Sequence, residues 1–227
     1  MKTQKLLVIA AIVCLLVGAS GAAMAEELSV CPNGIINGGE YETIALSLDF
    51  QDCVIVGVSV TTPAGVRVNN PGNFIMMGSY VAGVVRVFRT GGGDDDGSTA
   101  AILYNVVEGG NIVTKYLNEA DVRWNKVNNG NIRVIDDPNS PGQYAEIIGN
   151  KIDGRLVARG NVSADVKGND TNGGNIVVDD NLAAEVKNNG ATEGNIRCSD
   201  NVVLDAFGNE ASGGTVNCSR GTNGNGP

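Results

Sequence analysis

Apolar and polar residues alternate in short runs through the C-terminal half of the chain. Between Gly174 and Asn189, the apolar positions are Ile176, Val178, Leu182, Ala184 and Val186. A spacing of two predicts strands with one buried face, because helices repeat their apolar residues at three and four. Asn, Asp and Gly interrupt the runs, and we expect turns there, because these residues adopt positive φ at low cost.

The same unit returns at intervals of roughly 20 residues. A Gly-Asn-Ile sequence, or a close variant, begins at Gly110, Gly130, Gly154, Gly174, Gly194 and Gly214. A second marker keeps step with it at Asn105, Asn125, Asn150, Asn169, Asn189 and Asn209. We therefore predict an all-β fold, a single-stranded parallel β-helix solenoid of about eight or nine coils. The general rule for parallel crossovers favours the right-handed sense, although the repeat itself does not determine it.

Stacked coils should bring equivalent residues to about 4.8 Å from one another. One inward column is Ile112, Ile132, Leu156, Ile176, Ile196 and Val216, and another is Ile102, Val122, Ile147, Val166, Val186 and Ala206. We expect the six asparagines to form an asparagine ladder, with side-chain amides bonded from coil to coil. The alternative is that they are ordinary turn residues.

The pattern continues upstream in a looser form. Gly83 opens a similar unit, and Gly78 and Gly57 stand where a ladder asparagine is expected, which places Ile75 and Val54 inward. Residues 91–97 and 137–142 are rich in Gly, Asp and Pro, and we predict loops inserted between coils.

The chain divides into three segments. Residues 1–25 have the form of a secretory signal peptide, with Lys2 and Lys5 before an apolar run and Ala23-Met24-Ala25 as the cleavage site. Cys14 has no small residue before it, which disfavours a lipid anchor. Residues 26–218 form the solenoid with an N-terminal cap, and residues 219–227 form a disordered tail. We expect an exported protein (extracellular, cell-surface or periplasmic) without a membrane span after signal cleavage.

Four cysteines remain after the signal is removed: Cys31, Cys53, Cys198 and Cys218. An even number in an exported chain predicts disulfides. Cys198 and Cys218 each lie four residues after a marker glycine, so they occupy equivalent positions in adjacent coils, about 5 Å apart. Cys31 and Cys53 remain to close the N-terminal end. A metal site is disfavoured, because the chain has no CxxC motif and no histidine.

The formal net charge is −9, or about −11 once Lys2 and Lys5 are removed. This acidity argues against nucleic acid and anionic membranes as partners. Five carboxylates should stack outward in one column: Asp121, Glu146, Asp165, Glu185 and Asp205. Arg123, Lys167 and Lys187 should lie beside them, giving a solvated face with weak ion pairs. The alternative is Ca²⁺ bound between adjacent coils through these weak candidate ligands; we expect no other cofactor.

Two features of the sequence are candidate sites of chemistry. A polysaccharide-active β-helix enzyme needs a groove and paired carboxylates, for which Asp180 and Asp200 are the candidates. Such aspartates are more typical of turns, and the absence of histidine removes the commonest general base. Tyr104 and Trp124 occupy equivalent positions in neighbouring coils. They could form a sugar platform, but the sequence favours their packing into a corner of the core.

The N-terminal segment has Cys31, the Gly-rich step 34–39, and Cys53 followed by Val-Ile-Val-Gly. Together with the Gly-Asn-Ile units and the last two cysteines, it resembles a group of small exported bacterial hypothetical proteins with right-handed parallel β-helix repeats. The segments at Asp94 and Pro138 depart from that pattern. The resemblance implies the fold and carries no biochemical role.

The expected function is therefore a non-catalytic exported structural or binding solenoid, with a cell-envelope glycan or protein as partner. The alternatives are a carbohydrate-active β-helix enzyme of the lyase or hydrolase kind, a Ca²⁺-stabilised adhesin-like module, and end-to-end assembly into filaments.

Overall fold

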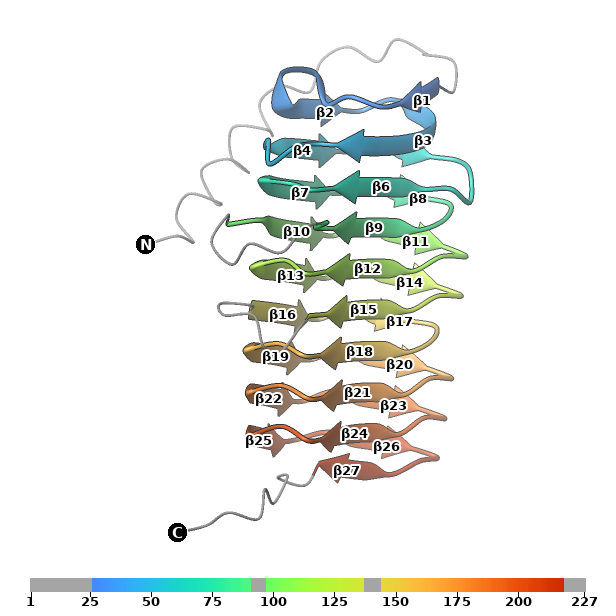
Figure 1. Cartoon of the computed structure of the whole chain (residues 1–227). Helices are drawn as coiled ribbons and strands as arrows, with labels where there is room; N and C mark the ends of the chain where they lie inside the picture. The colour runs from blue at the N-terminus through green and yellow to red at the C-terminus, as the bar shows by residue number, and fades with distance from the viewer. Residues whose placement is uncertain (1–25, 91–96, 137–143, 219–227) are drawn as a thin grey trace.

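The computed structural model describes residues 26–90, 97–136 and 144–218. Over these residues the chain winds into a straight parallel β-solenoid of about nine coils, which confirms the predicted fold (Figure 1). The described residues contain no α-helix, only a 3-10 turn, η1, at Pro32–Gly34. The predicted signal peptide, the C-terminal tail and nearly all of the two inserted loops lie outside the described residues.

Each coil contributes one strand to each of three faces. Face 1, on the left in Figure 1, is a nine-stranded parallel sheet. Its strands are β2 (Ile35–Asn37), β4 (Cys53–Val56), β7 (Asn73–Met77), β10 (Thr99–Leu103), β13 (Glu119–Arg123), β16 (Tyr144–Ile148), β19 (Ser163–Lys167), β22 (Ala183–Lys187) and β25 (Val203–Phe207).

Face 2 carries the shortest strands of the coil. They are β5 (Ser59–Val60), β8 (Tyr80–Val81), β11 (Val106–Glu108), β14 (Lys126–Asn128), β17 (Lys151–Ile152), β20 (Asp170–Asn172), β23 (Gly190–Thr192) and β26 (Glu210–Ser212).

Face 3, at the front of Figure 1, closes the coil. Its strands are β6 (Val66–Asn69), β9 (Val85–Phe88), β12 (Ile112–Lys115), β15 (Ile132–Ile135), β18 (Leu156–Arg159), β21 (Ile176–Asp179), β24 (Ile196–Ser199) and β27 (Val216–Cys218). Strand β3 (Glu40–Ser47) pairs with both β5 and β6, so it runs through faces 2 and 3 and joins them into one sheet. Strand β1 (Glu26–Leu28) pairs with β3 at the N-terminal end.

The core is filled by the predicted aliphatic columns. Ile112, Ile132, Leu156, Ile176 and Ile196 stack in register, as do Ile102, Val122, Ile147, Val166 and Val186, and all are fully buried. The expected last members behave differently: Val216 is 44% exposed and Ala206 is half-buried. These two residues lie in the last described coil, which has no further described coil packed against it.

The predicted asparagine ladder is present from Asn105 to Asn209. At each step, the backbone N–H and side-chain Nδ2 of one asparagine donate to Oδ1 of the next. The Nδ2 of each asparagine also donates to the carbonyl oxygen of an inward strand residue one coil earlier, as Asn150 does to Val122 at 2.8 Å. Primary amides can form such rows because each carries both a donor and an acceptor. The ladder therefore satisfies backbone groups that the turn leaves unpaired.

Two further rows of asparagine were missed from the sequence. Asn161, Asn181 and Asn201 form a buried row at the corner between faces 3 and 1. At the corner between faces 2 and 3, Asn131 donates to Asn111 and Asn195 donates to Asn175. The donors of this last row point toward the N-terminus, opposite to those of the long ladder. All three corners of the coil are thus held by side-chain amides.

The upstream alignment was wrong by one residue. The register pairs Ile102 with Met76 and Met76 with Ile55, so these two fully buried residues continue the inward column. Ile75 and Val54 lie on the outward side of face 1 instead. The position equivalent to Asn105 is Ser79, whose N–H donates to Asn105 Oδ1 and whose Oγ accepts from the N–H of Val58. A serine hydroxyl replaces the amide there, so the ladder continues without asparagine.

Close approach of adjacent coils explains the marker glycines, and Gly154 alone among them also has a positive φ, 153°. A Cβ added to Gly130 would lie 1.6 Å from the carbonyl oxygen of Gly110, and one on Gly194 would lie 2.0 Å from that of Gly174. No side chain fits between backbones at that distance. The Gly-Asn-Ile marker therefore records where successive coils lie too close for a side chain.

Both predicted disulfides are present. Cys198 and Cys218 face each other across β24 and β27 with their Cα atoms 4.3 Å apart, and Cys31 and Cys53 join the N-terminal turn to β4. Disulfides indicate an oxidising compartment. They link neighbouring coils near the two ends of the described solenoid.

Replacing Asn150 by Ala should strongly destabilise the fold. Asn150 is fully buried, and its loss leaves the amide of Asn125 and the carbonyl of Val122 without partners. We expect the free energy of unfolding in denaturant to fall by about 3 kcal/mol. Asn195→Ala is the control, because this exposed asparagine can be replaced by water; equal losses at both positions would contradict the role of the buried ladder.

Replacing Gly130 by Ala should cost about 3 kcal/mol or more, because the new methyl group would overlap the backbone of the adjacent coil. The matched variant is Gly190→Ala, whose Cβ would meet only the side-chain oxygen of Asp170. We expect a change of no more than about 0.5–1 kcal/mol there. Thermal unfolding of the two variants measures the difference, and similar melting temperatures would disprove the close-approach explanation.

Candidate functional site

Tyr104 and Trp124 form an aromatic stack on the outside of the solenoid. They lie at the corner between faces 1 and 2, directly after β10 and β13. Their ring centroids are 4.8 Å apart and their planes differ by 18°. Tyr104 is 55% exposed and Trp124 is 44% exposed. The preferred interpretation from the sequence, that the pair fills a corner of the core, is therefore wrong.

Backbone geometry explains why both rings point outward. Tyr104 has φ of 57° and Trp124 has φ of 55°, in the left-handed region that bulky residues rarely adopt. Equivalent positions in other coils hold residues suited to it, at Gly57, Gly78, Gly149, Gly168, Asn188 and Gly208, all with positive φ. The turn directs the side chain away from the core. The Gly and Asn residues at this position in the other coils were the sequence signal from which the outward direction of the two rings could have been predicted.

The stack is closed on one side and open on the other. A Cβ on Gly149 would lie 2.7 Å from Cδ1 of Trp124, so the indole covers that glycine. On the other side of Tyr104 comes Gly78, and a Cβ there would meet no atom within 4 Å. Arg123 lies beside the stack, with its guanidinium carbon 5.8 Å from the centre of the indole ring. Open space thus adjoins Tyr104, and a cation flanks Trp124.

The predicted column of carboxylates is also present on face 1. Strand register places Asp121, Glu146, Asp165, Glu185 and Asp205 in successive coils. Arg123 contacts both Asp121 and Glu146. Lys167 Nζ lies 2.7 Å from Asp165 and 2.9 Å from Glu185. Lys187 likewise contacts Glu185 and Asp205. Each cation therefore joins the carboxylates of two coils, and this acidic ridge is an alternating ion-pair network.

Two carboxyl groups of the ridge have pKa values shifted in opposite directions. Burial raises the pKa of Asp121, against the opposing effect of the Arg123 charge. Hydrogen bonds from Lys187 and Lys167 lower the pKa of Glu185. Arginine occupies the space between Asp121 and Glu146, so a substrate or water cannot lie between that pair. The arrangement suits structural ion pairing.

Among the described residues, no group of three or more His, Cys, Asp or Glu side chains is arranged to hold a metal ion. Between Glu146 and Asp165 the cation column is interrupted by Ile148, and a shallow depression of about 280 Å³ lies beside them. These two carboxylates are the part of the ridge that the Ca²⁺ alternative would have to use.

The aspartates considered for catalysis have structural roles in their turns. Asp180 and Asp200 both have positive φ, 58° and 56°, in adjacent coils. Asp179, only 2% exposed, accepts hydrogen bonds from Nε and Nη2 of Arg159 and lies 3.5 Å from Nη2 of Arg197. Asp137, in the second of the two predicted loops, lies outside the described residues.

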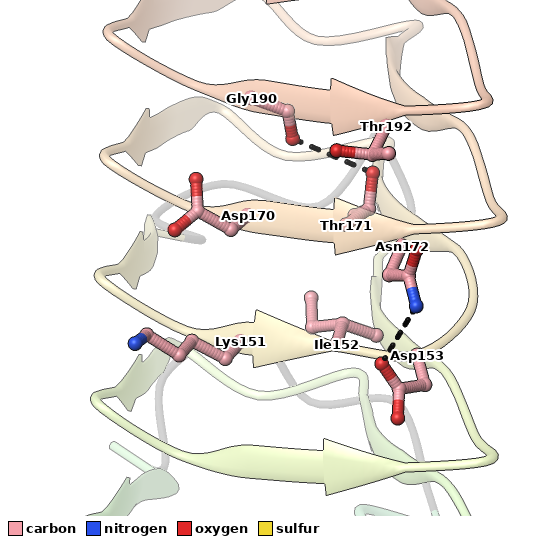
Figure 2. Close-up of a pocket in the computed structure, with 8 residues that line it drawn as sticks. All are labelled: Lys151, Ile152, Asp153, Asp170, Thr171, Asn172, Gly190 and Thr192. Atoms are coloured by element: carbon pink, nitrogen blue, oxygen red, sulfur yellow. Dashed lines mark hydrogen bonds between the residues drawn. The ribbon is translucent and has the colours of Figure 1, made fainter. Parts of the chain in front are cut away.

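A polar depression of about 370 Å³ lies on face 2, where Gly190 has no side chain (Figure 2). Its polar groups mostly bond to one another. Asn172 donates to Asp153 at 3.4 Å, and Thr171 donates to the carbonyl oxygens of Gly174 and Gly190. These bonds leave the polar side chains of Lys151, Asp170 and Thr192, on three separate strands, without a hydrogen-bond partner among the described residues. We assign it no function.

Glu185→Gln should weaken the acid dependence of stability. The folded-state pKa of Glu185 lies below its ordinary value of 4.5, so its ion pairs stabilise the fold above that pH and are lost as pH falls below it. We expect the variant to lose about 0.5 kcal/mol at pH 7 and to converge with the parent chain at pH values below the folded-state pKa of Glu185. Melting temperature against pH measures this. Glu210→Gln, an exposed residue of face 2, is the control, and parallel curves for Glu185→Gln and the parent would contradict the interpretation.

Comparison with known proteins identifies no relative. No family model, no curated protein and no solved structure matches the chain. No helix in the described residues is long and apolar enough to cross a membrane.

Proposed function

We propose that this chain is an exported, non-catalytic binding solenoid, and that the Tyr104–Trp124 stack binds a glycan of the cell envelope. The proposal depends on one observation, the exposed aromatic pair in left-handed backbone. A bulky residue in this conformation costs roughly 1–2 kcal/mol. The other coils avoid that cost with glycine or asparagine, so the fold does not require either ring.

The geometry of the stack suits a sugar ring. Flat aromatic faces pack against apolar C–H surfaces, and the phenol and indole groups add a hydrogen-bonding edge. The space next to Tyr104 above Gly78 is open to a ring of similar thickness. Arg123, beside the indole of Trp124, is a donor at the other end of the stack. A few polar groups beside an apolar platform are typical of small-ligand sites.

Export and the absence of catalysis are parts of the same proposal. The two disulfides favour an oxidising compartment, which agrees with the signal-like residues 1–25. The chain has no histidine, and its paired carboxylates are neutralised by arginine or lysine. These features support binding rather than glycan cleavage.

A protein partner is the second candidate, and a different observation favours it. Apart from Asn73 and Thr99, the outward residues of β4, β7 and β10 are apolar, whereas the ridge farther along face 1 is charged. They include Val54, Val56, Met77 and Leu103, all half-buried. Aromatic and Met side chains together are enriched at protein interfaces. In this case the aromatic pair would lie at the edge of a larger apolar contact.

Binding of neutral oligosaccharides tests the glycan proposal directly. Trp124 is the only tryptophan, so its fluorescence reports on the site. Titration with hexamers of glucose and of N-acetylglucosamine should change its emission. Tyr104→Gly should weaken binding about tenfold, as expected for the loss of one stacking face worth about 1.4 kcal/mol.

The glycine substitution also separates binding from folding. It removes a stacking contact worth about 0.5–1.5 kcal/mol but relieves a strain of similar size, so the melting temperature should hardly change. Tyr116→Gly, which removes an exposed tyrosine with φ of 59° at another corner, is the matched control and should bind normally. The proposal fails if no glycan shifts the fluorescence, or if Tyr104→Gly binds as well as the parent chain.

A further inference from the structure

The outward side of face 3 carries an uncompensated row of cations. Strands β6, β9, β12 and β15 have the sequences VRVN, VRVF, IVTK and IRVI, with four cations and no acidic residue. We call Arg67, Arg86, Lys115 and Arg133 the basic stripe. The three arginines are exposed and Lys115 is half-buried. This concentration of positive charge contrasts with the net charge of −9 for the whole chain.

The same face is neutralised in its C-terminal half. There Asp179 lies between Arg159 and Arg197 and forms ion pairs with both. No ion pair among the described residues involves any member of the basic stripe. Register places Arg67 directly beside Arg86 on the neighbouring strand. Like charges in that position destabilise a sheet, so the stripe has a cost that the rest of the face avoids.

The surface between the cations is apolar. The guanidinium carbon of Arg86 lies 5.2 Å from the centre of the Phe88 ring, and Lys115 Nζ lies 5.9 Å from it. In the outward column of the arginines, Val113 lies between Arg86 and Arg133, and Val157 follows Arg133. The stripe thus combines spaced positive charges with a flat apolar floor, and it spans four coils, about 14 Å.

We propose that the basic stripe binds a linear anionic polysaccharide that carries carboxylate or sulfate groups. Its position on face 3 makes it a site separate from the aromatic stack at the corner of faces 1 and 2. Arg86 and Arg133 are two coils apart, about 10 Å, so charges that recur along an extended chain can meet them in turn. The C–H faces of the sugar rings pack on the half-buried Phe88, which lies between Arg86 and Lys115.

The width of the stripe favours a polysaccharide over nucleic acid or a membrane. Each strand of face 3 presents only two outward residues, so the stripe is about 7 Å wide. A duplex or a lipid surface is wider than the stripe and would meet more of a chain whose net charge is −9, which repels it. A single polymer chain follows the stripe without that contact.

The test compares variants of the purified chain with equal charge. In Arg67→Gln/Arg86→Gln/Arg133→Gln the stripe is neutralised. In Lys126→Gln/Lys151→Gln/Arg197→Gln three cations outside the stripe are removed, with the same change in net charge. The probes are dextran sulfate and polygalacturonate, with uncharged dextran as the negative control, and affinity is measured by calorimetry at low and high salt.

Neutralising the stripe should weaken binding of at least one anionic probe by about 30-fold at low salt and flatten its salt dependence. The control triple variant should change affinity by no more than about threefold, and Arg67→Lys/Arg86→Lys/Arg133→Lys should keep most of the binding. Circular dichroism and melting temperature verify that each variant is folded. Tyr104→Gly should not alter this binding, which keeps the test independent of the glycan site at the corner.

Three results would overturn the proposal. The first is that neither anionic polymer binds the parent chain at low salt. The second is that both triple variants lose affinity equally, which would mean that net charge alone is responsible. The third is tighter binding of duplex DNA or of vesicles containing anionic lipid than of either polysaccharide, which would identify the stripe as a site for a different class of partner.

Discussion

The hydrogen-bonded spacing between coils, about 4.8 Å, is the constraint on which this structure depends. Each residue has its equivalents directly above and below it, so each position must be compatible with a near copy of itself. Aliphatic residues meet this requirement by packing, and asparagine meets it because an amide is both donor and acceptor. Glycine meets it where the backbones approach so closely that no side chain fits. These three solutions account for the core, the corners and the marker motif.

Residues of like charge repel one another when they stack in successive coils. The structure accommodates charged residues in three ways. On face 1, lysine and arginine lie beside the carboxylate column and each joins two coils. On the C-terminal half of face 3, a buried aspartate is held between two arginines. On the N-terminal half of that face, the four cations of the basic stripe have no such partner among the described residues. Positions that depart from the general solution of a fold are the ones where function is most often found.

The features that follow from the equal spacing of the repeats could be predicted from the sequence. The coil, the long asparagine ladder and the pairing of Cys198 with Cys218 all depend only on which residues are 20 apart, and they are confirmed. The prediction of the upstream register was wrong because Ser79, not an asparagine, occupies the ladder position there. The sequence instead suggested Gly78, the residue before it, as that position. The row from Asn161 to Asn201 spans too few coils to stand out as a periodic signal.

The aromatic pair was misjudged for a different reason. Residue type suggests that Tyr and Trp are buried, but the backbone conformation of a turn determines the direction of the side chain. The left-handed backbone at this position could be inferred only from the equivalent residues of the other coils, most of which are glycine. Likewise, the basic stripe is visible in four short strands separated by about 20 residues, and it emerges only when they are placed side by side.

The two disulfides have a consequence for how such a molecule can come apart. In a stack where each coil touches only its neighbours, unravelling normally starts at an end, because only one interface must be broken there. Here Cys31–Cys53 and Cys198–Cys218 cross-link neighbouring coils near both ends of the described solenoid. Fraying is blocked at those coils, and an opening must start inside the stack, where two interfaces break together. The barrier to unfolding, and with it the lifetime against proteases, is then set by the middle of the solenoid rather than by its ends.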